Sequence, residues 1–553
     1  APPLRRFETL HAGFIRPPPL AAHLRAHPDT EHPMPQTAHR STWTDEGLLH
    51  AAPLNADTSA DVCIVGAGIA GLLIAERLSA EGRSIVVIDA GAIAGGETSR
   101  TTAHLVTALD DRYTSLIDMH GEKGAQLAAQ SHAAAIDHVE QLVTRLGIDC
   151  GWRRLDGYLT VNNRHHEKAG ELIDQELEAA RKSGLAVDRV EHLPRPWPGV
   201  GPALRFPNQA QVHPIRLLNG VARHLTSKGV RLFSNTRAVG ITGGTSPCVR
   251  TGDTDGPTIS AAQIVVATNT PINTIVSIHT KQAGYQTYVV ALRVPAGSLP
   301  PALMWDGPWE DDVSYRYIRL MNAATEGAGE DLLIVGGEDH KTGQGPDGPE
   351  PFRCLEQWAR ANFPMCGAVE RRWSGEVMEP ADGVAYIGPS PTGDGNLFMV
   401  TGDSGNGITH GAIAGMLIPD QILGRGRQNP WTELYNPARK IGRHALKDYA
   451  QENLNTLAQY RDWLKRGTAR SEADIEPGRG AIVTHGLKHL AIYKDKSGQC
   501  TRVSAVCPHL GGIVRWNDQE QTWDCPCHAS RFDKTGKVIH GPANTNLKPE
   551  TEA

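Results

Sequence analysis

An apolar strand that leads into a glycine-rich loop constrains the fold of this chain more than any other feature. Asp61 to Val65 is a continuous apolar run of the type found in buried parallel strands. It continues into Gly66-Ala67-Gly68-Ile69-Ala70-Gly71, a predicted helix over 72–80, and a second apolar strand over 84–88 that ends at Asp89. This order of elements is that of a dinucleotide-binding fold and predicts an α/β domain with a Rossmann-like parallel sheet.

Each residue type in this loop has a physical reason. Gly66 permits the tight turn, Gly68 lets a pyrophosphate approach backbone N–H groups at the positive end of the helix, and Gly71 lets helix and strand pack closely. Asp89 can accept hydrogen bonds from ribose hydroxyls. These four residues are therefore predicted to bind a dinucleotide cofactor.

Two short segments near the C-terminal end each offer one thiol and one imidazole. Cys507 and His509 stand in the first segment, and Cys525 and His528 in the second. A [2Fe–2S] centre in which two histidines replace two cysteines on one iron needs this donor set. A structural zinc site is the alternative, because zinc also accepts mixed Cys and His ligands. Zinc sites usually pair like residues, so the spacing favours the iron–sulfur interpretation.

The segment from about residue 472 to the end resembles a Rieske [2Fe–2S] domain. The resemblance rests on Cys507-Pro508-His509-Leu510-Gly511, on Cys525-Pro526-Cys527-His528, on Ser530 and Phe532, and on Gly541-Pro542-Ala543. It implies a small all-β domain over 472–553. Its metal ligands would be Cys507, His509, Cys525 and His528.

This segment departs from the Rieske pattern of respiratory complexes at two positions. Those proteins brace their ligand loops with a disulfide, but Gly512 stands where the partner of Cys527 would be. We therefore expect Cys527 to be a free thiol. Phe532 stands where a tyrosine hydroxyl can hydrogen-bond a ligand sulfur, and fewer such bonds predict a midpoint potential near the low end of the Rieske range.

Two further segments indicate FAD rather than NAD as the dinucleotide. The first is the Gly/Ser/Thr-rich loop from Gly95 to His104, and the second runs from Thr401 to Gly411. Both resemble motifs of the D-amino-acid oxidase-like family of flavoenzymes. The resemblance implies FAD as a cofactor, bound by Arg100, Thr101, Thr102, Gly402, Asp403, Gly407 and Ile408.

The same resemblance implies a division of the chain into domains. An FAD-dependent oxidoreductase would occupy residues 56–430, with FAD-binding segments at about 56–120, 205–280 and 380–430. A substrate domain containing an antiparallel sheet would lie mainly in 150–204 and 281–379, with strands over 285–294, 313–321 and 332–336. The segment Gly336-Gly337-Glu338-Asp339-His340 is interpreted as a turn at the end of a strand. A helical linker is predicted over 431–471, because apolar residues recur there at helical intervals.

Four residues are candidates for catalysis. Tyr315-Arg316-Tyr317-Ile318-Arg319 resembles a strand of the oxidase family in which an arginine near the flavin holds a carboxylate in a bidentate pair. Arg319 and Tyr317 are taken from this strand, and Tyr288 from the strand before it. His104 is predicted near the flavin, and some relatives attach flavin through a histidine in this region. A buried strand tyrosine or arginine more often has a packing or ion-pair role.

Composition excludes several function classes. The 553 residues exceed what one hydrophobic core usually organises, which predicts two or three domains. A net charge of -6 offers no basic face for nucleic acid. No run reaches the length of a transmembrane helix. Nine scattered cysteines do not indicate a secreted disulfide scaffold, so we expect a cytoplasmic protein. Residues 1–55 are predicted to be a partly disordered N-terminal extension, with a natural start at Met34.

The two predicted redox centres together indicate electron transfer. Oxidation of a C–N bond gives two electrons to FAD, whereas a [2Fe–2S] cluster takes one at a time. We expect a dehydrogenase acting on an amine, an N-methyl amine or an amino acid, with electrons leaving through the cluster to an external protein or quinone. Two alternatives stay open, a reductase component that serves an oxygenase and a non-enzymatic redox sensor. The first needs NAD(P)H, although only one glycine-loop unit is visible in the sequence.

Overall fold

The apolar run before the glycine loop forms the centre of a parallel sheet. The structure, a computed structural model, describes residues 40–161, 166–199, 201–252, 256–272, 276–307, 309, 315–322, 329–345, 350–486 and 488–550. Within these ranges the first sheet has eight strands, and β17-β10-β1-β2-β7 run parallel through it. Its strands are β1 (Thr58–Val65), β2 (Ile85–Ile88), β7 (Arg231–Phe233), β8 (Ala238–Thr242), β9 (Cys248–Thr251), β10 (Thr258–Val266), β16 (Tyr386–Pro389) and β17 (Leu397–Thr401). The strands predicted around the glycine loop are confirmed as β1 and β2.

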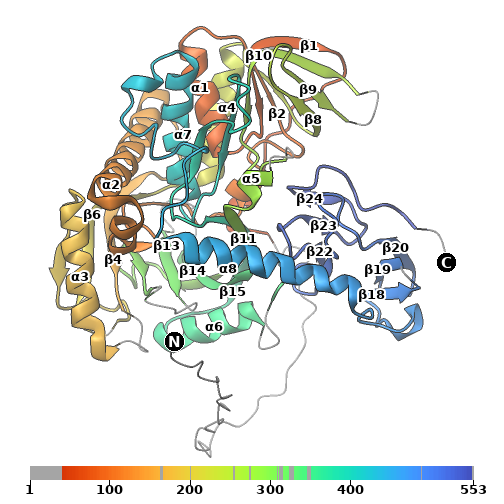
Figure 1. Ribbon diagram of the computed structural model, residues 1–553. Helices are drawn as coiled ribbons and strands as arrows, with labels where there is room; N and C mark the ends of the chain where they lie inside the picture. The colour runs from red at the N-terminus through yellow and green to blue at the C-terminus, as the bar shows by residue number, and fades with distance from the viewer. Residues whose placement is uncertain are drawn as a thin grey trace, which may run out of the picture. The chain divides into compact units, whose positions relative to one another are not determined.

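Alternate residues of β1 face two different cores, as the two-residue period of a strand requires. Val62 and Ile64 pack with side chains of the helices, whereas Cys63 and Val65 pack with β8, β9 and β10. In Figure 1, α1, α4 and α7 lie together beside the sheet. The helices are α1 (Ile69–Ala80), α2 (Arg112–Leu146), α3 (Ala169–Lys182), α4 (Pro214–Ser227) and α7 (Gly407–Ile422).

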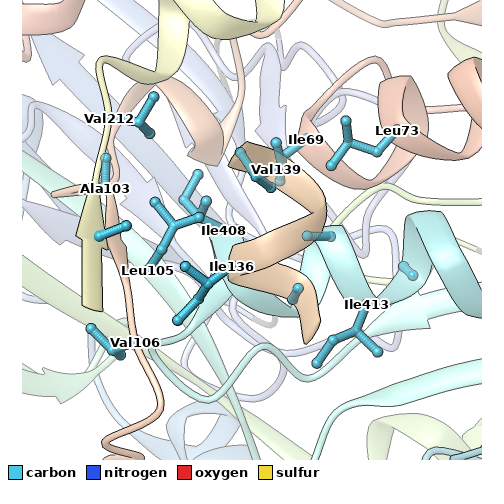
Figure 2. Close-up of a cluster of buried hydrophobic side chains, with 14 of the residues drawn as sticks. Ile69, Leu73, Ala103, Leu105, Val106, Ile136, Val139, Val212, Ile408 and Ile413 are labelled. Atoms are coloured by element: carbon cyan, nitrogen blue, oxygen red, sulfur yellow. The ribbon is translucent and has the colours of Figure 1, made fainter. Parts of the chain in front are cut away.

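The core between α1, α2 and α7 is built from aliphatic side chains. Figure 2 shows Ile69 of α1, Ile136 and Val139 of α2, and Ile408 of α7 around a common centre, with Leu105 beside them. Helix α2 begins at Arg112. It is interrupted at Gly121, whose φ of 70° is outside the helical region.

A second sheet has nine strands and is mainly antiparallel. Its order is β15-β11-β14-β13-β12-β4-β6-β3, with β5 paired to β6. The strands are β3 (His104–Leu105), β4 (Arg153–Leu159), β5 (Asp188–Val190), β6 (Ala203–Gln211), β11 (Gln282–Pro295), β12 (Leu303–Trp305), β13 (Arg316–Met321), β14 (Glu330–Lys341) and β15 (Val369–Pro380). Helix α6 (Pro351–Asn362) packs on it through Phe352 and Leu355.

Two sequence predictions about this sheet require correction. Residues 205–211 were assigned to an FAD-binding segment, but they belong to β6, which pairs with β4 and β3 in the second sheet. Residues 336–340 were interpreted as a turn, but they continue β14 as far as Lys341. Glycine is required at position 336 of this strand, because the ring of Tyr317 lies over it and a Cβ there would overlap the ring. Residues 313 and 314 of a predicted strand lie outside the described residues.

The C-terminal segment forms two small antiparallel sheets. One contains β18 (Arg479–His485), β19 (Lys488–Lys494) and β20 (Cys500–Ser504), and the other β21 (Arg515–Asn517), β22 (Thr522–Asp524), β23 (Arg531–Asp533) and β24 (Val538–His540). Trp523 and Phe532 are fully buried in the core of this domain. The predicted all-β character of this segment is confirmed.

Helix α8 (Leu446–Gln459) lies in the predicted linker and contacts both halves of the chain. Asn453 donates to the carbonyl of Thr280, and Gln344 bonds both Asn455 and the carbonyl of Pro526. Residues 38–553 form one compact unit. The connection is therefore a packed helix rather than a free tether.

The predicted N-terminal extension is only partly described, because residues 1–39 and Met34 with them lie outside the described residues. From residue 40 the chain is packed into the fold. Trp43 is fully buried and its Nε1 donates to Thr101 O at 2.6 Å. Part of the segment predicted as an extension, from residue 40 to residue 55, thus belongs to the folded oxidoreductase half. None of the helices in the described ranges is both long and apolar enough to cross a bilayer.

A buried ion pair fixes the chain after α7 to the rest of the oxidoreductase half. Arg439 donates to both carboxylate oxygens of Asp382 at 2.6 and 2.7 Å, and the two side chains are 9% and 2% exposed. We expect Arg439→Met to lower the thermal midpoint, because removing one partner of a buried pair costs about 3–5 kcal/mol. Arg425→Met removes an exposed pair with Glu81 and should leave the midpoint unchanged. Equal midpoints for both variants in differential scanning calorimetry would contradict this role.

Candidate active site

The glycine loop forms one end of a long cavity. Gly66 has a φ of 108°, and a Cβ there would overlap the carbonyl of Ala267 at the end of β10. Asp89 braces the loop, because its carboxylate accepts hydrogen bonds from the N–H groups of Ala67 and Gly91, both at 2.8 Å. A Cβ on Gly71 would overlap the carbonyl of Gly66. The close packing of helix and strand predicted at Gly71 is therefore confirmed.

The cavity extends from the first sheet to the second. The predicted FAD-binding residues on its wall are Gly66, Gly68, Asp89, Arg100, Thr101, Thr102, Asp403, Gly407 and Ile408. Gly71 and Gly402 do not line the cavity. They instead allow close packing next to it, where a side chain would not fit. The helices α1 and α7 both begin at the wall, after Gly68 and Asn406 respectively. Their N-terminal N–H groups and positive dipole ends favour a ligand with phosphate groups and an anionic ring.

Two of the four predicted catalytic residues do not reach the cavity. The guanidinium of Arg319 donates from Nη1 to the carbonyls of Thr102, Ala103 and Val212 at 2.8, 2.9 and 3.2 Å. It supports the loop at 102–103 from behind and does not face a substrate carboxylate. Tyr288 is on the opposite side of the second sheet, with its ring 5.0 Å from that of Phe352.

His104 and Tyr317 do lie on the cavity wall. The imidazole of His104 has Thr102 Oγ1 3.0 Å from Nδ1 and the carbonyl of Ile318 3.4 Å from Nε2. Burial, together with the charge of Arg319, lowers the pKa of His104 to about 3, so the ring is neutral. The Tyr317 hydroxyl is 2.6 Å from Thr287 Oγ1.

Sequence reasoning missed four other side chains at this end of the cavity, namely Asp110, Trp305, Tyr315 and Asp339. Trp305 lies over Gly157 of the neighbouring strand, where a Cβ would be 2.7 Å from its ring. Asp339 is in the segment that was interpreted as a turn. For Trp305 the sequence signal was Gly157, a small residue that leaves room for the ring, but this relation can be recognised only when the strand pairing is known.

The two C-terminal ligand segments lie side by side as loops. Cys507 and His509 follow β20, and Cys525 and His528 lie between β22 and β23. Both cysteines are 2% exposed, and the rings of the two histidines are 5.1 Å apart at 89°. Among the described residues no three His, Cys, Asp or Glu side chains converge as a single ion would need. A [2Fe–2S] cluster takes only two protein ligands on each iron, so this donor set fits it.

Comparison with known proteins identifies the family. Residues 61–421 match the family described as FAD dependent oxidoreductase. The chain belongs to this family. Residues 466–550 match the Rieske [2Fe-2S] domain, so FAD and a Rieske cluster are its cofactors. The cavity and the loops described above fit these two groups.

Several known proteins are similar to this FAD dependent oxidoreductase. A Bacillus subtilis (strain 168) protein named putative Rieske 2Fe-2S iron-sulfur protein YhfW is 31% identical over 509 residues, which are 92% of this chain and 96% of the relative. Gamma-glutamylputrescine oxidoreductase of Escherichia coli (strain K12) is 23% identical over 416 residues, 70% of this chain and 90% of the relative. The crystal structure of glycine oxidase from Geobacillus kaustophilus has the same fold, with a TM-score of 0.55 and 20% identity over 69% of this chain and all of that chain.

In this oxidoreductase the cluster domain packs directly against the FAD-binding half. The ring of His279, in the short helix α5 (Val276–His279), is 4.7 Å from that of His509 and 5.9 Å from that of His528. His540 of β24, in the same domain, lines the cavity, and its Nδ1 is 3.1 Å from Glu376 Oε2. The Rieske domain therefore forms part of the wall of the cavity.

Gly66→Ala tests the cavity as the FAD site. We expect this variant to lose bound flavin, because the added methyl group overlaps the carbonyl of Ala267 and the backbone has a positive φ. Gly170→Ala, in α3 with open space at its Cβ, is the matched control. The ratio of flavin absorbance to protein absorbance in the purified proteins is the measurement. Full flavin content in Gly66→Ala would place the cofactor elsewhere.

Gly512→Cys tests the geometry of the cluster loops. A Cβ on Gly512 would be 2.6 Å from the Sγ and 3.3 Å from the Cβ of Cys527, close to disulfide spacing. We therefore expect the new cysteine to form a disulfide with Cys527 on oxidation, detected by thiol counting with mass spectrometry. The double variant Gly512→Cys, Cys527→Ser should not form it. An oxidised single variant in which the introduced cysteine and Cys527 both remain titratable thiols would show that the loops are farther apart.

Proposed function

We propose that this FAD dependent oxidoreductase dehydrogenates a small amine, N-methyl amine or amino acid and delivers the electrons through its Rieske cluster to an external acceptor, a protein or a quinone. The observation that carries the proposal is the shared wall. One cavity is bounded by the glycine loop, by the second sheet and by His540 of the cluster domain. When bound, FAD supplies hydride acceptance from a C–H bond next to nitrogen, and the cluster supplies one-electron transfer.

The residues of the second sheet support this chemistry. Trp305, Tyr315 and Tyr317 give the cavity aromatic walls that exclude water from a bound substrate. Burial raises the pKa of Asp110 to about 7, and this carboxylate is on the same wall. A group with such a pKa can take a proton from a substrate amine near neutral pH. The names of similar proteins, gamma-glutamylputrescine oxidoreductase and glycine oxidase, point to the same donor class.

The packing of the two halves supports an internal route for electrons. Arg515 of β21 donates to the carbonyl of Gly343 at 3.0 Å, and Asn517 donates to Gln286 at 3.1 Å. Thr456 of α8 donates to the carbonyl of Cys527. These contacts hold the ligand loops against the oxidoreductase half, as transfer between two fixed centres needs.

Removing a cluster ligand tests the electron route. In the wild-type holoprotein, anaerobic titration with a panel of amines and amino acids should bleach the flavin and generate the electron paramagnetic resonance signal of the reduced cluster. Cys525→Ser should keep flavin bleaching and lose that signal, whereas Cys527→Ser should keep both because Cys527 is not a ligand.

Two results would contradict the proposal. One is a wild-type cluster that stays oxidised while the flavin is reduced and is then rapidly reoxidised by oxygen. The other is flavin bleaching by NADH but by no amine, which would favour a reductase component.

A further inference from the structure

The end of the cavity at the second sheet is a box of aromatic rings. Trp305 lies in β12, Tyr317 in β13 and His104 in β3. Tyr315 is the residue immediately before β13 begins. The His104 ring lies 5.7 Å from Trp305 and 6.2 Å from Tyr317, and the rings of Tyr315 and Tyr317 are 5.9 Å apart. Electron-rich ring faces at this spacing are the usual surroundings of a bound alkylammonium ion.

Two carboxylates, Asp110 and Asp339, line the same box. Asp339 Oδ2 accepts a hydrogen bond from the Tyr315 hydroxyl at 3.0 Å. Its Oδ1 is buried and makes no hydrogen bond of ordinary geometry within the part of the chain that the structure describes, although the nearby Thr287 hydroxyl lowers the pKa of this carboxyl. Burial raises the pKa of Asp339 to about 6 and that of Asp110 to about 7. The charges of Arg316 and Arg112 oppose these two shifts, and the neighbouring acids Asp111, Asp339 and Asp403 add to that of Asp110. An added positive charge would stabilise both carboxylates.

The arginines nearest to the box hold other groups. Arg112 donates to the carbonyls of Leu109 and Gly307. Arg316 donates to the Tyr315 carbonyl and to Glu338. Neither guanidinium lines the cavity. A substrate carboxylate would therefore meet Asp110 and Asp339 rather than an arginine fork.

The two arginines that do line the cavity are held at other segments. Arg100 donates to the carbonyl of Ser374 in β15, and Arg237 to that of Val538 in β24. Since His104 is neutral, the described wall of the box carries negative and aromatic groups without a positive one.

We propose that this box binds the positively charged nitrogen of an alkylammonium substrate that has no carboxylate next to the amine. Asp339 Oδ1 accepts a hydrogen bond from the ammonium group, the three aromatic side chains of Trp305, Tyr315 and Tyr317 contact its alkyl substituents, and Asp110 supplies the second negative charge. The inference rests on the proposed function, because it names the substrate class within amine oxidation.

Binding is tested first, on the holoprotein and without turnover. The probes are tetramethylammonium, which has no N–H bond to lose, and acetate, each titrated while flavin absorbance and fluorescence are recorded. We expect tetramethylammonium to perturb the flavin spectrum and acetate to have no effect. A perturbation by acetate alone overturns the proposal.

Variants of one strand, β14, separate the site from a general effect of charge. For N-methylethylamine, Asp339→Asn should raise the dissociation constant roughly tenfold or more, because a hydrogen bond between charged groups is lost. Glu330→Gln removes the same charge from an exposed position that pairs with Arg293 outside the cavity, and it should change nothing. Equal affinities in Asp339→Asn and wild type overturn the proposal. If Asp339→Asn does not fold, the wild-type comparison of cation and anion still decides.

A matched substrate pair distinguishes this inference from the proposed function. N-methylethylamine and N-methylglycine differ by a methyl group in place of a carboxylate, and we expect only the former to bleach the flavin anaerobically. Faster bleaching by N-methylglycine overturns the inference and leaves amine oxidation intact. Specific binding of tetramethylammonium without bleaching by any amine supports the cation site and contradicts the proposed function.

Discussion

The close approach of three backbone segments at Gly66 is the constraint on which the cavity depends. The end of β1, the start of α1 and the end of β10 meet there, and Gly66, Gly71 and Ala267 leave no room for a side chain between them. The N–H of Gly66 donates to Ile88 and that of Ala267 to Val65, both at 2.8 Å. Because these bonds fix the N-terminus of α1, they also fix where a pyrophosphate can lie. The shape of the cavity at the glycine loop is thus a product of backbone packing more than of side-chain contacts.

The same principle governs the second sheet. Tyr317 can turn into the cavity because its register partner is Gly336. The ring of Trp305 lies over Gly157, two residues from its register partner Leu159. A larger side chain at either glycine would displace the ring and open the box. The aromatic walls, the carboxylates and the neutral imidazole of His104 then follow from strand register. This arrangement is the basis of the proposed preference for a positively charged substrate.

The two redox halves are joined by direct contacts as well as by the polypeptide chain. The cluster loops contact α5 and α8, and β24 of the same domain reaches the FAD cavity. A tethered domain would leave the flavin-to-cluster separation variable. Here Arg515, Asn517 and Gln344 hydrogen-bond across the boundary and hold the cluster loops against the oxidoreductase half.

The sequence by itself determined the features that depend on local order. The strand, glycine loop, helix and acid around Gly66 and the two Cys-His segments can be recognised one after another along the chain, and they define both cofactors. Arg319 and Tyr288 could not be placed in this way. Both are strand residues, and which face a strand residue points to depends on the register with its neighbours.

Only the tertiary structure decided the substrate end of the cavity. It turned Arg319 behind the loop at 102–103, extended β14 to include Asp339, and brought Asp110 beside residues more than 200 positions later in the sequence. The physical reason is that residue type alone does not fix where a charged side chain points. Burial and pairing between distant strands determine which charged groups face the cavity and which form hydrogen bonds with backbone carbonyls.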